Sequence, residues 1–128
     1  DYVGAGALTQ AVEFMEETGI DAIAAHEHDL LEYATPLMME IPGMRIFGTA
    51  PGKCAVISFL IGRAHHYDTG MLLDKLGFAV RTGHHCAQPL MQALGIEGTV
   101  RASFAAYNTR AEVDAFIAAL HRLAPMLQ

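Results

Sequence analysis

The sequence has few residues of several types, and their scarcity limits the functions that the protein can have. It has no tryptophan, only 2 cysteines, and 8 Lys and Arg residues in 128. The formal net charge of −6 disfavours sequence-independent binding to nucleic acid or to an anionic membrane, because both depend on clustered basic side chains. No apolar run approaches the ~20 residues of a membrane-spanning helix, and no signal sequence is evident. We therefore expect a protein of the reducing cytoplasm that has neither nucleic acid nor membrane as a partner.

The two cysteines lie in contrasting surroundings. Cys54 begins an apolar run that is typical of a strand, so we expect it to be a small buried hydrophobic residue. Cys86 lies in a polar, histidine-rich loop. A disulfide between them is therefore not expected, and the 52% hydrophobic content predicts that one core supports a single domain.

Helical periodicity is present in four segments, and a fifth short helix is predicted at a proline. Apolar residues recur at helical spacing over 4–17 and 22–40, with Asp21 as the expected cap of the second helix and Pro36 as an expected kink. Two further helices are expected over 67–76 and from Thr109, where Thr109 and Glu112 form a capping box. The fifth begins at Pro89 and ends at Gly95.

Short apolar runs between these helices predict strands. Residues 44–48 and 54–60 are separated by Thr-Ala-Pro-Gly, which predicts an antiparallel hairpin. Residues 78–81 and 99–104 are the other expected strands, and the second alternates so that Arg101 lies on the face opposite to Val100. The predicted fold is α+β (mixed α/β), with helices packed on a sheet of three or four strands.

The loop around Cys86 combines the groups that thiol chemistry needs. Arg81, His84 and His85 precede Cys86, and Arg101 follows fifteen residues later. Cys86 is the candidate nucleophile, because thiolates attack sulfur well and are favoured by nearby cationic groups or a helix amino terminus. A semi-exposed structural thiol is the alternative.

The neighbouring cationic residues suggest roles in substrate binding and proton transfer. Arg101 can hold a carboxylate through two parallel hydrogen bonds, although a solvent-facing salt bridge is the alternative. His84 and His85 could move a proton to or from Cys86 or the leaving carbon, or could only form hydrogen bonds. Arg81 is expected to anchor the loop or to reach the site from its edge. No metal site is expected, because adjacent residues cannot easily all face one ion.

Two segments resemble a known family. Arg-Thr-Gly-His-His-Cys-Ala-Gln-Pro-Leu-Met, residues 81–91, and Arg-Ala-Ser-Phe-Ala-Ala-Tyr-Asn-Thr, residues 101–109, resemble the carboxy-terminal part of SUF-type (group II) cysteine desulfurases. These enzymes belong to the pyridoxal-phosphate aminotransferase-like superfamily. The order of elements over about 4–124 is also similar to that part of the family.

The resemblance implies a role for each residue. The cysteine matching Cys86 takes sulfur from L-cysteine as a persulfide, L-alanine leaves, and the sulfur passes to an acceptor for iron–sulfur cluster assembly. The arginine matching Arg101 holds the substrate carboxylate. Pyridoxal 5'-phosphate is held by a lysine that matches neither Lys53 nor Lys75.

The resemblance also implies an incomplete enzyme. Residues 1–20 are expected to be a connector helix and 21–128 the small domain, with the large domain and its cofactor lysine outside this chain. The chain alone is expected to be inactive and to lack covalently bound cofactor, and the longer enzyme is expected to be a homodimer. A cofactor-free persulfide carrier or interaction module, and a selenocysteine lyase, remain as alternatives.

Overall fold

A small antiparallel sheet forms the centre of the fold. The computed structural model describes residues 1–128, and its four strands have the order β1-β2-β4-β3. The strands are β1 Met44–Phe47, β2 Val56–Ile61, β3 Arg81–Gly83 and β4 Thr99–Ser103. The helices are α1 Tyr2–Thr18, α2 Ile20–Met39, α3 His66–Lys75, α4 Gln88–Leu94 and α5 Arg110–Leu123, followed by a 3₁₀ turn at Ala124–Met126. This confirms the predicted α+β class.

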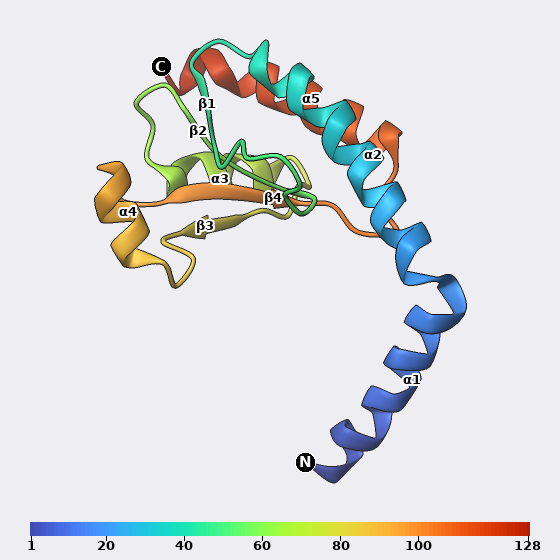
Figure 1. Ribbon diagram of the computed structural model, residues 1–128. Coiled ribbons are helices and arrows are strands. Elements are labelled where there is room, and N and C mark those ends of the chain that lie inside the picture. The colour runs from blue at the N-terminus through green and yellow to red at the C-terminus, as the bar shows by residue number, and fades with distance from the viewer.

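The core lies between one face of the sheet and the helices. Figure 1 shows α2 and α5 side by side above the sheet, while α4 lies at one end of it. The core has 20 buried hydrophobic residues, including Leu30 of α2, Phe59 of β2 and Leu120 of α5. Burial of these apolar side chains is the main force that holds the helices on the sheet.

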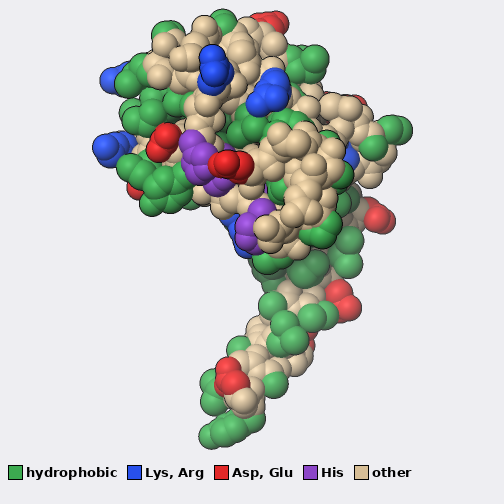
Figure 2. Space-filling view, turned by 90° about the vertical axis from the view of Figure 1, so that its left-hand side faces the viewer, with side chains coloured by type: hydrophobic (Ala, Val, Ile, Leu, Met, Phe, Trp, Pro, Cys, Tyr) green, Lys and Arg blue, Asp and Glu red, His purple; other side chains and the backbone are tan.

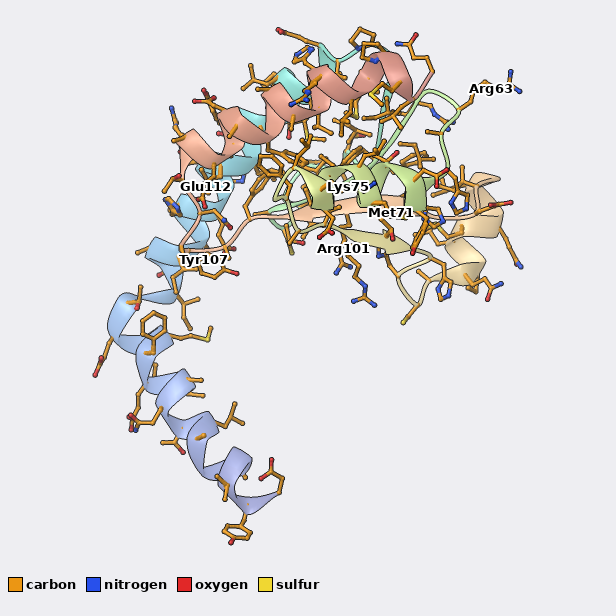
Figure 3. The ribbon with its side chains drawn as sticks, turned by 180° about the vertical axis from the view of Figure 1, so that it is seen from behind. Arg63, Met71, Lys75, Arg101, Tyr107 and Glu112 are labelled. Carbon is orange, nitrogen blue, oxygen red and sulfur yellow. The ribbon has the colours of Figure 1, made fainter.

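Strand β4 separates the core from the open face of the sheet. Val100 is 0% exposed and Ala102 is 6% exposed, and both belong to the core. Arg101 lies between them and therefore points to the opposite face. The predicted alternation is confirmed, and it places a guanidinium on the face that α2 and α5 leave open (Figure 3).

Two helix starts show how local chemistry sets the boundaries. The capping box of α5 is formed, since Thr109 Oγ1 accepts from the Glu112 amide and the Glu112 carboxylate accepts from the Thr109 amide. The predicted cap of α2 is wrong. Gly19 is the N-cap and Asp21 lies in the first turn, where its charge still favours the positive end of the helix. Helix α2 then continues through Pro36 to Met39.

The predicted strand 78–81 is displaced along the chain. Strand β3 begins only at Arg81. The Phe78 amide donates to the Leu73 carbonyl and the Gly77 amide to the Asp74 carbonyl, so these residues close the end of α3. Because its amide is used by the helix end, Phe78 does not join the ladder with β4.

The prediction that Cys54 is buried is wrong. Cys54 is an exposed free thiol that precedes β2, and β2 begins at Val56. The Val56 amide donates to the Cys54 carbonyl at 2.7 Å, which turns the chain before the strand starts. The apolar run in the sequence, which starts at Cys54, therefore begins before strand β2 does.

Helix α1 has no buried residue and extends away from the rest of the fold (Figure 1). Its exposed apolar side chains include Val3, Leu8, Val12, Phe14 and Met15. None of the helices combines the length and the apolar character needed to cross a membrane.

Candidate active site

The loop after β3 carries Cys86 in an unusual backbone conformation. His85 has a φ of 54° and Cys86 a φ of 58°, and they are the two non-glycine residues of the chain with positive φ. This left-handed conformation costs free energy for residues with a Cβ atom, so surrounding contacts must hold it. Strained backbone of this kind is concentrated at functional sites.

Two histidines supply contacts that hold the loop. The Cys86 amide donates to His84 Nδ1 at 3.1 Å. His85 Nε2 lies 3.1 Å from the Thr99 carbonyl oxygen and 3.0 Å from Thr99 Oγ1. A carbonyl only accepts, so the proton of a neutral His85 ring is on Nε2. His85 Nδ1 is then an unprotonated acceptor, and it is buried without a protein partner.

A row of side chains crosses the open face of the sheet beside this loop. Arg81 of β3 is directly opposite Arg101 of β4, and Arg101 is directly opposite Ser58 of β2. Like charges in directly opposed positions destabilise a sheet unless an anion neutralises them. Neither guanidinium has a carboxylate partner in the chain, and Arg101 Nε is buried without any hydrogen-bond partner.

A cleft of about 500 Å³ joins the row to the histidine loop. Its apolar wall comes mainly from α4, and its polar wall includes Ser58, Thr99, His85 and Arg101. The residues that line it are Phe47, Gly48, Val56, Ser58, His85, Ala87, Leu90, Met91, Leu94, Thr99 and Arg101. Positive charge and unsatisfied polar groups at one end of a mainly apolar cleft suit a small amphipathic anion such as an amino acid.

The electrostatics of the loop keep His85 uncharged. Burial lowers the pKa of His85, and the charges of Arg101, Arg81 and His84 lower it further, whereas the hydrogen bond to Thr99 raises it. The net direction is downward from 6.5. His85 is therefore neutral near pH 7 and serves as a hydrogen-bonded anchor, while His84 is exposed to solvent.

The structure brings the five candidate residues into one neighbourhood. Cys86, His84 and His85 share the loop, and Arg81 and Arg101 are cross-strand neighbours whose charges act on His85. Sequence reasoning missed Thr99 and Ser58. The alternation of β4 puts Thr99 on the same face as Arg101 and could have identified it, but Ser58 follows only from the register of β2 against β4.

Neither lysine lies in this cleft. Lys53 Nζ donates to the Gly48 carbonyl at 2.8 Å, and burial lowers the pKa of Lys53. It lines a different cleft beside Glu32 and Thr35, and Lys75 is in the last turn of α3. No three His, Cys, Asp or Glu side chains are grouped so that they could hold a metal ion.

The chain is similar to several known proteins. The aminotransferase class-V family matches residues 1–116. A probable cysteine desulfurase from Mycolicibacterium paratuberculosis is 49% identical over 97% of this chain and 18% of its own length.

Two solved structures share the fold. The apo cysteine desulfurase from Thermococcus onnurineus has a TM-score of 0.86 and 36% identity over 91% of this chain and 29% of that protein. The cysteine desulfurase CsdA (S-sulfonic acid) from Escherichia coli has a TM-score of 0.84 and 36% identity over 92% of this chain and 29% of that protein. The chain thus spans less than a third of the length of these relatives.

Proposed function

Because the chain belongs to the aminotransferase class-V family, we propose that it is the small-domain part of a longer pyridoxal-phosphate-dependent cysteine desulfurase. The stretch that these relatives share with it is only 18% and 29% of their own length. Residues 21–128 would be the small domain, and residues 1–20 a connector to the large domain. The absence of buried residues in α1 supports a connector that packs on chain outside this range.

The residues of this chain do not fit the cofactor itself. Lys53 is tied to a backbone carbonyl and lies outside the Arg101 cleft, and Lys75 is exposed on α3. The lysine that holds pyridoxal phosphate is therefore expected in the large domain. What residues 1–128 offer instead is a thiol and an anion site, which are the parts that meet the amino acid substrate.

Cys86 is the proposed acceptor of sulfur. An S–S bond forms between Cys86 Sγ and the substrate sulfur while the substrate Cβ–S bond breaks. The bonding electrons remain on carbon, which takes up a proton, so that L-cysteine and thiol become L-alanine and a persulfide. The exposed position of Cys86 supports both this attack and the later transfer of sulfur to an acceptor protein.

The pair of arginines is the proposed carboxylate clamp. Arg101 projects into the cleft with an unpartnered Nε, and a carboxylate can receive two parallel hydrogen bonds from one guanidinium. Arg81 lies directly across the ladder and would add charge from the edge of the site. These opposed, unneutralised arginines beside the Cys86 loop are the single observation that carries the proposal.

The two histidines take different roles in this proposal. His85 positions the loop, because its Nε2–H is engaged by Thr99 and its Nδ1 is buried. His84 accepts from the Cys86 amide through Nδ1, so the proton of its neutral ring is on the solvent-accessible Nε2. His84 is therefore the better candidate for moving a proton near the thiol.

The sulfur acceptor, the oligomeric state and the cellular role are proposed from the resemblance of residues 81–91 and 101–109 to SUF-type cysteine desulfurases. We expect the acceptor to be a sulfur-accepting protein of a SUF system, the longer enzyme to be a homodimer in the cytoplasm, and the product sulfur to serve iron–sulfur cluster assembly. Selenocysteine would fit the same carboxylate clamp. A cofactor-free persulfide carrier is favoured by one observation, namely that the cleft is lined by His85 and Ala87, the neighbours of Cys86, but by no lysine.

The deciding experiment compares the longer enzyme with residues 1–128. We expect the longer enzyme to show the absorption band of a lysine-bound cofactor and to release alanine from L-cysteine, and the 128-residue chain to do neither. A long form without cofactor and without alanine release, whose Cys86 still accepts and donates sulfur, would replace the desulfurase by the carrier.

A further inference from the structure

His66, at the start of α3, is a partly buried histidine that the proposed mechanism does not use. Its ring packs against that of His65 in a tilted arrangement, with ring centroids 4.1 Å apart and an interplanar angle of 35°. Its Nδ1 is buried and has no hydrogen-bond partner. A ring with an unsatisfied buried nitrogen has a cost in free energy, so its position calls for a compensating role.

The contacts of His66 lead to the root of the Cys86 loop. A Cβ atom added to Gly98 would lie 2.7 Å from the Gly83 carbonyl oxygen and 2.7 Å from His66 Nε2. Gly98 therefore fits only because it has no side chain, and it brings the ring of His66 close to the last residue of β3. One helical turn further, a Cβ on Gly70 would overlap Thr82 Cγ2, so α3 is packed tightly against β3 as well.

The charges around His66 come from three segments. Burial is the largest influence and lowers the pKa of His66, and the charges of His65 and His85 lower it further. Glu97 and Asp68 act in the opposite direction. Glu97 is itself engaged by His65, whose Nε2 lies 3.2 Å from its carboxylate, while His65 Nδ1 accepts from the Tyr67 amide.

Figure 2 shows that histidine side chains gather beside acidic side chains on the face at the α4 end. His66 and His85 both have lowered pKa values, and the charge of His85 is one of the influences that lower the pKa of His66. His66 comes from α3, whereas His85 belongs to the loop itself and reaches Thr99 of β4. One imidazole therefore lies beside Gly98 at the root of the loop, and another ties the loop to Thr99.

We propose that His66 is a positioning residue that, as a neutral ring, supports Gly83 and Gly98 and thereby keeps the Cys86 loop in its left-handed conformation. A proton on His66 would bring charge into a desolvated position beside His65 and His85. The ring would then move toward solvent and withdraw its support from Gly83. The inference rests on the proposed function, because it concerns how the proposed sulfur-accepting thiol is held. Its test measures the conformation and alkylation of the loop and does not depend on that function.

The test uses Cys54 as a reference inside the same molecule. The alkylation rates of Cys86 and Cys54 by iodoacetamide are measured in the 128-residue chain by mass spectrometry between about pH 5 and 8, and their ratio is followed. We expect the ratio to fall by about threefold or more on acidification through a midpoint below the ordinary histidine value of 6.5, because a released loop no longer presents the thiol in one fixed conformation at the end of β3.

Variants identify the group that titrates. In His66→Gln, which is uncharged at every pH, this step should disappear. In His28→Phe, which removes an exposed histidine paired with Glu32 on α2, it should persist. A step that persists in His66→Gln would assign it to His84 or His85 and overturn the inference.

A second measurement needs no variant. The imidazole protons of His66 and the amide of Gly83 are followed by NMR in the wild-type chain over the same pH range. A common midpoint is expected, and separate midpoints would overturn the inference. The inference and the proposed function fail separately, because a Cys86 that shows this pH step but accepts no sulfur would contradict only the latter.

Discussion

The two cysteines of this chain make an instructive comparison. Both are exposed free thiols beside a strand of the same sheet, and both have a cationic residue nearby in sequence. Beside Cys54 the cationic residue is Lys53, and its Nζ donates to the Gly48 carbonyl. Cys86 has a left-handed backbone, an amide bonded to His84, and a neighbour that feels the charges of both Arg81 and Arg101.

Exposure is common to both cysteines, so exposure by itself does not single out the proposed nucleophile. What distinguishes Cys86 is a strained backbone held by contacts of His84 and His85, together with two arginines without a carboxylate partner whose charges act on His85. Each of the following changes removes one of these features, and the largest effect is expected where the thiol itself is lost.

Replacing the thiols is the strongest test. We expect Cys86→Ala in the longer enzyme to reduce alanine release from L-cysteine by roughly a thousandfold or more, because a nucleophile has no substitute at this position. Cofactor binding should be retained. The matched variant Cys54→Ala should stay near wild type, and equal losses in the two variants would mean that the site has been assigned to the wrong loop.

Weakening the clamp is the next test. Arg101→Lys should lower kcat/KM for L-cysteine by about tenfold to a hundredfold, because a lysine cannot make two parallel hydrogen bonds to a carboxylate. Arg45→Lys on β1 is the control, since Arg45 lies over the Phe47 ring and has no part in the clamp. Unchanged kinetics in Arg101→Lys would remove the carboxylate role.

The sequence alone predicts much of this site, but not the register in which its strands pair. The motif around Cys86, the position of Arg101 and its orientation to the open face follow from residue types and strand alternation, and the structure agrees with them. Local patterns cannot supply the pairing of Arg101 with Ser58, because register depends on long-range contacts. The burial of Cys54 was mispredicted for a related reason, since hydropathy does not show where the first ladder bond is made.

Loss of the Thr99 hydroxyl tests whether His85 anchors the Cys86 loop. Thr99→Val removes the hydroxyl that contacts His85 and keeps the carbonyl, so we expect a loss of about 1 kcal/mol in unfolding free energy together with altered alkylation of Cys86. Thr109→Val removes the cap of α5 and should cost about the same stability. Cys86 alkylation should be unchanged there, and a parallel change in both variants would show that global stability controls the thiol.

The smallest effect is expected from pH. His66 and His85 have pKa values below 6.5 in the folded chain, so the unfolded chain binds more protons as the pH falls through 6.5. Their contribution to the free energy of unfolding is therefore present above about 6.5, declines on acidification and levels off below the folded pKa values. Urea unfolding at several pH values measures this, and a stability that rises from neutral toward mildly acid pH would contradict it.

The account can be tested most directly by locating sulfur on the protein. The 128-residue chain is incubated with a small-molecule persulfide, and peptides containing Cys54 and Cys86 are compared by mass spectrometry. The account predicts that the additional sulfur atom is found on Cys86 and that Cys54 remains a thiol. Sulfur distributed equally between them, or found mainly on Cys54, would contradict the claim that the loop makes Cys86 the sulfur acceptor.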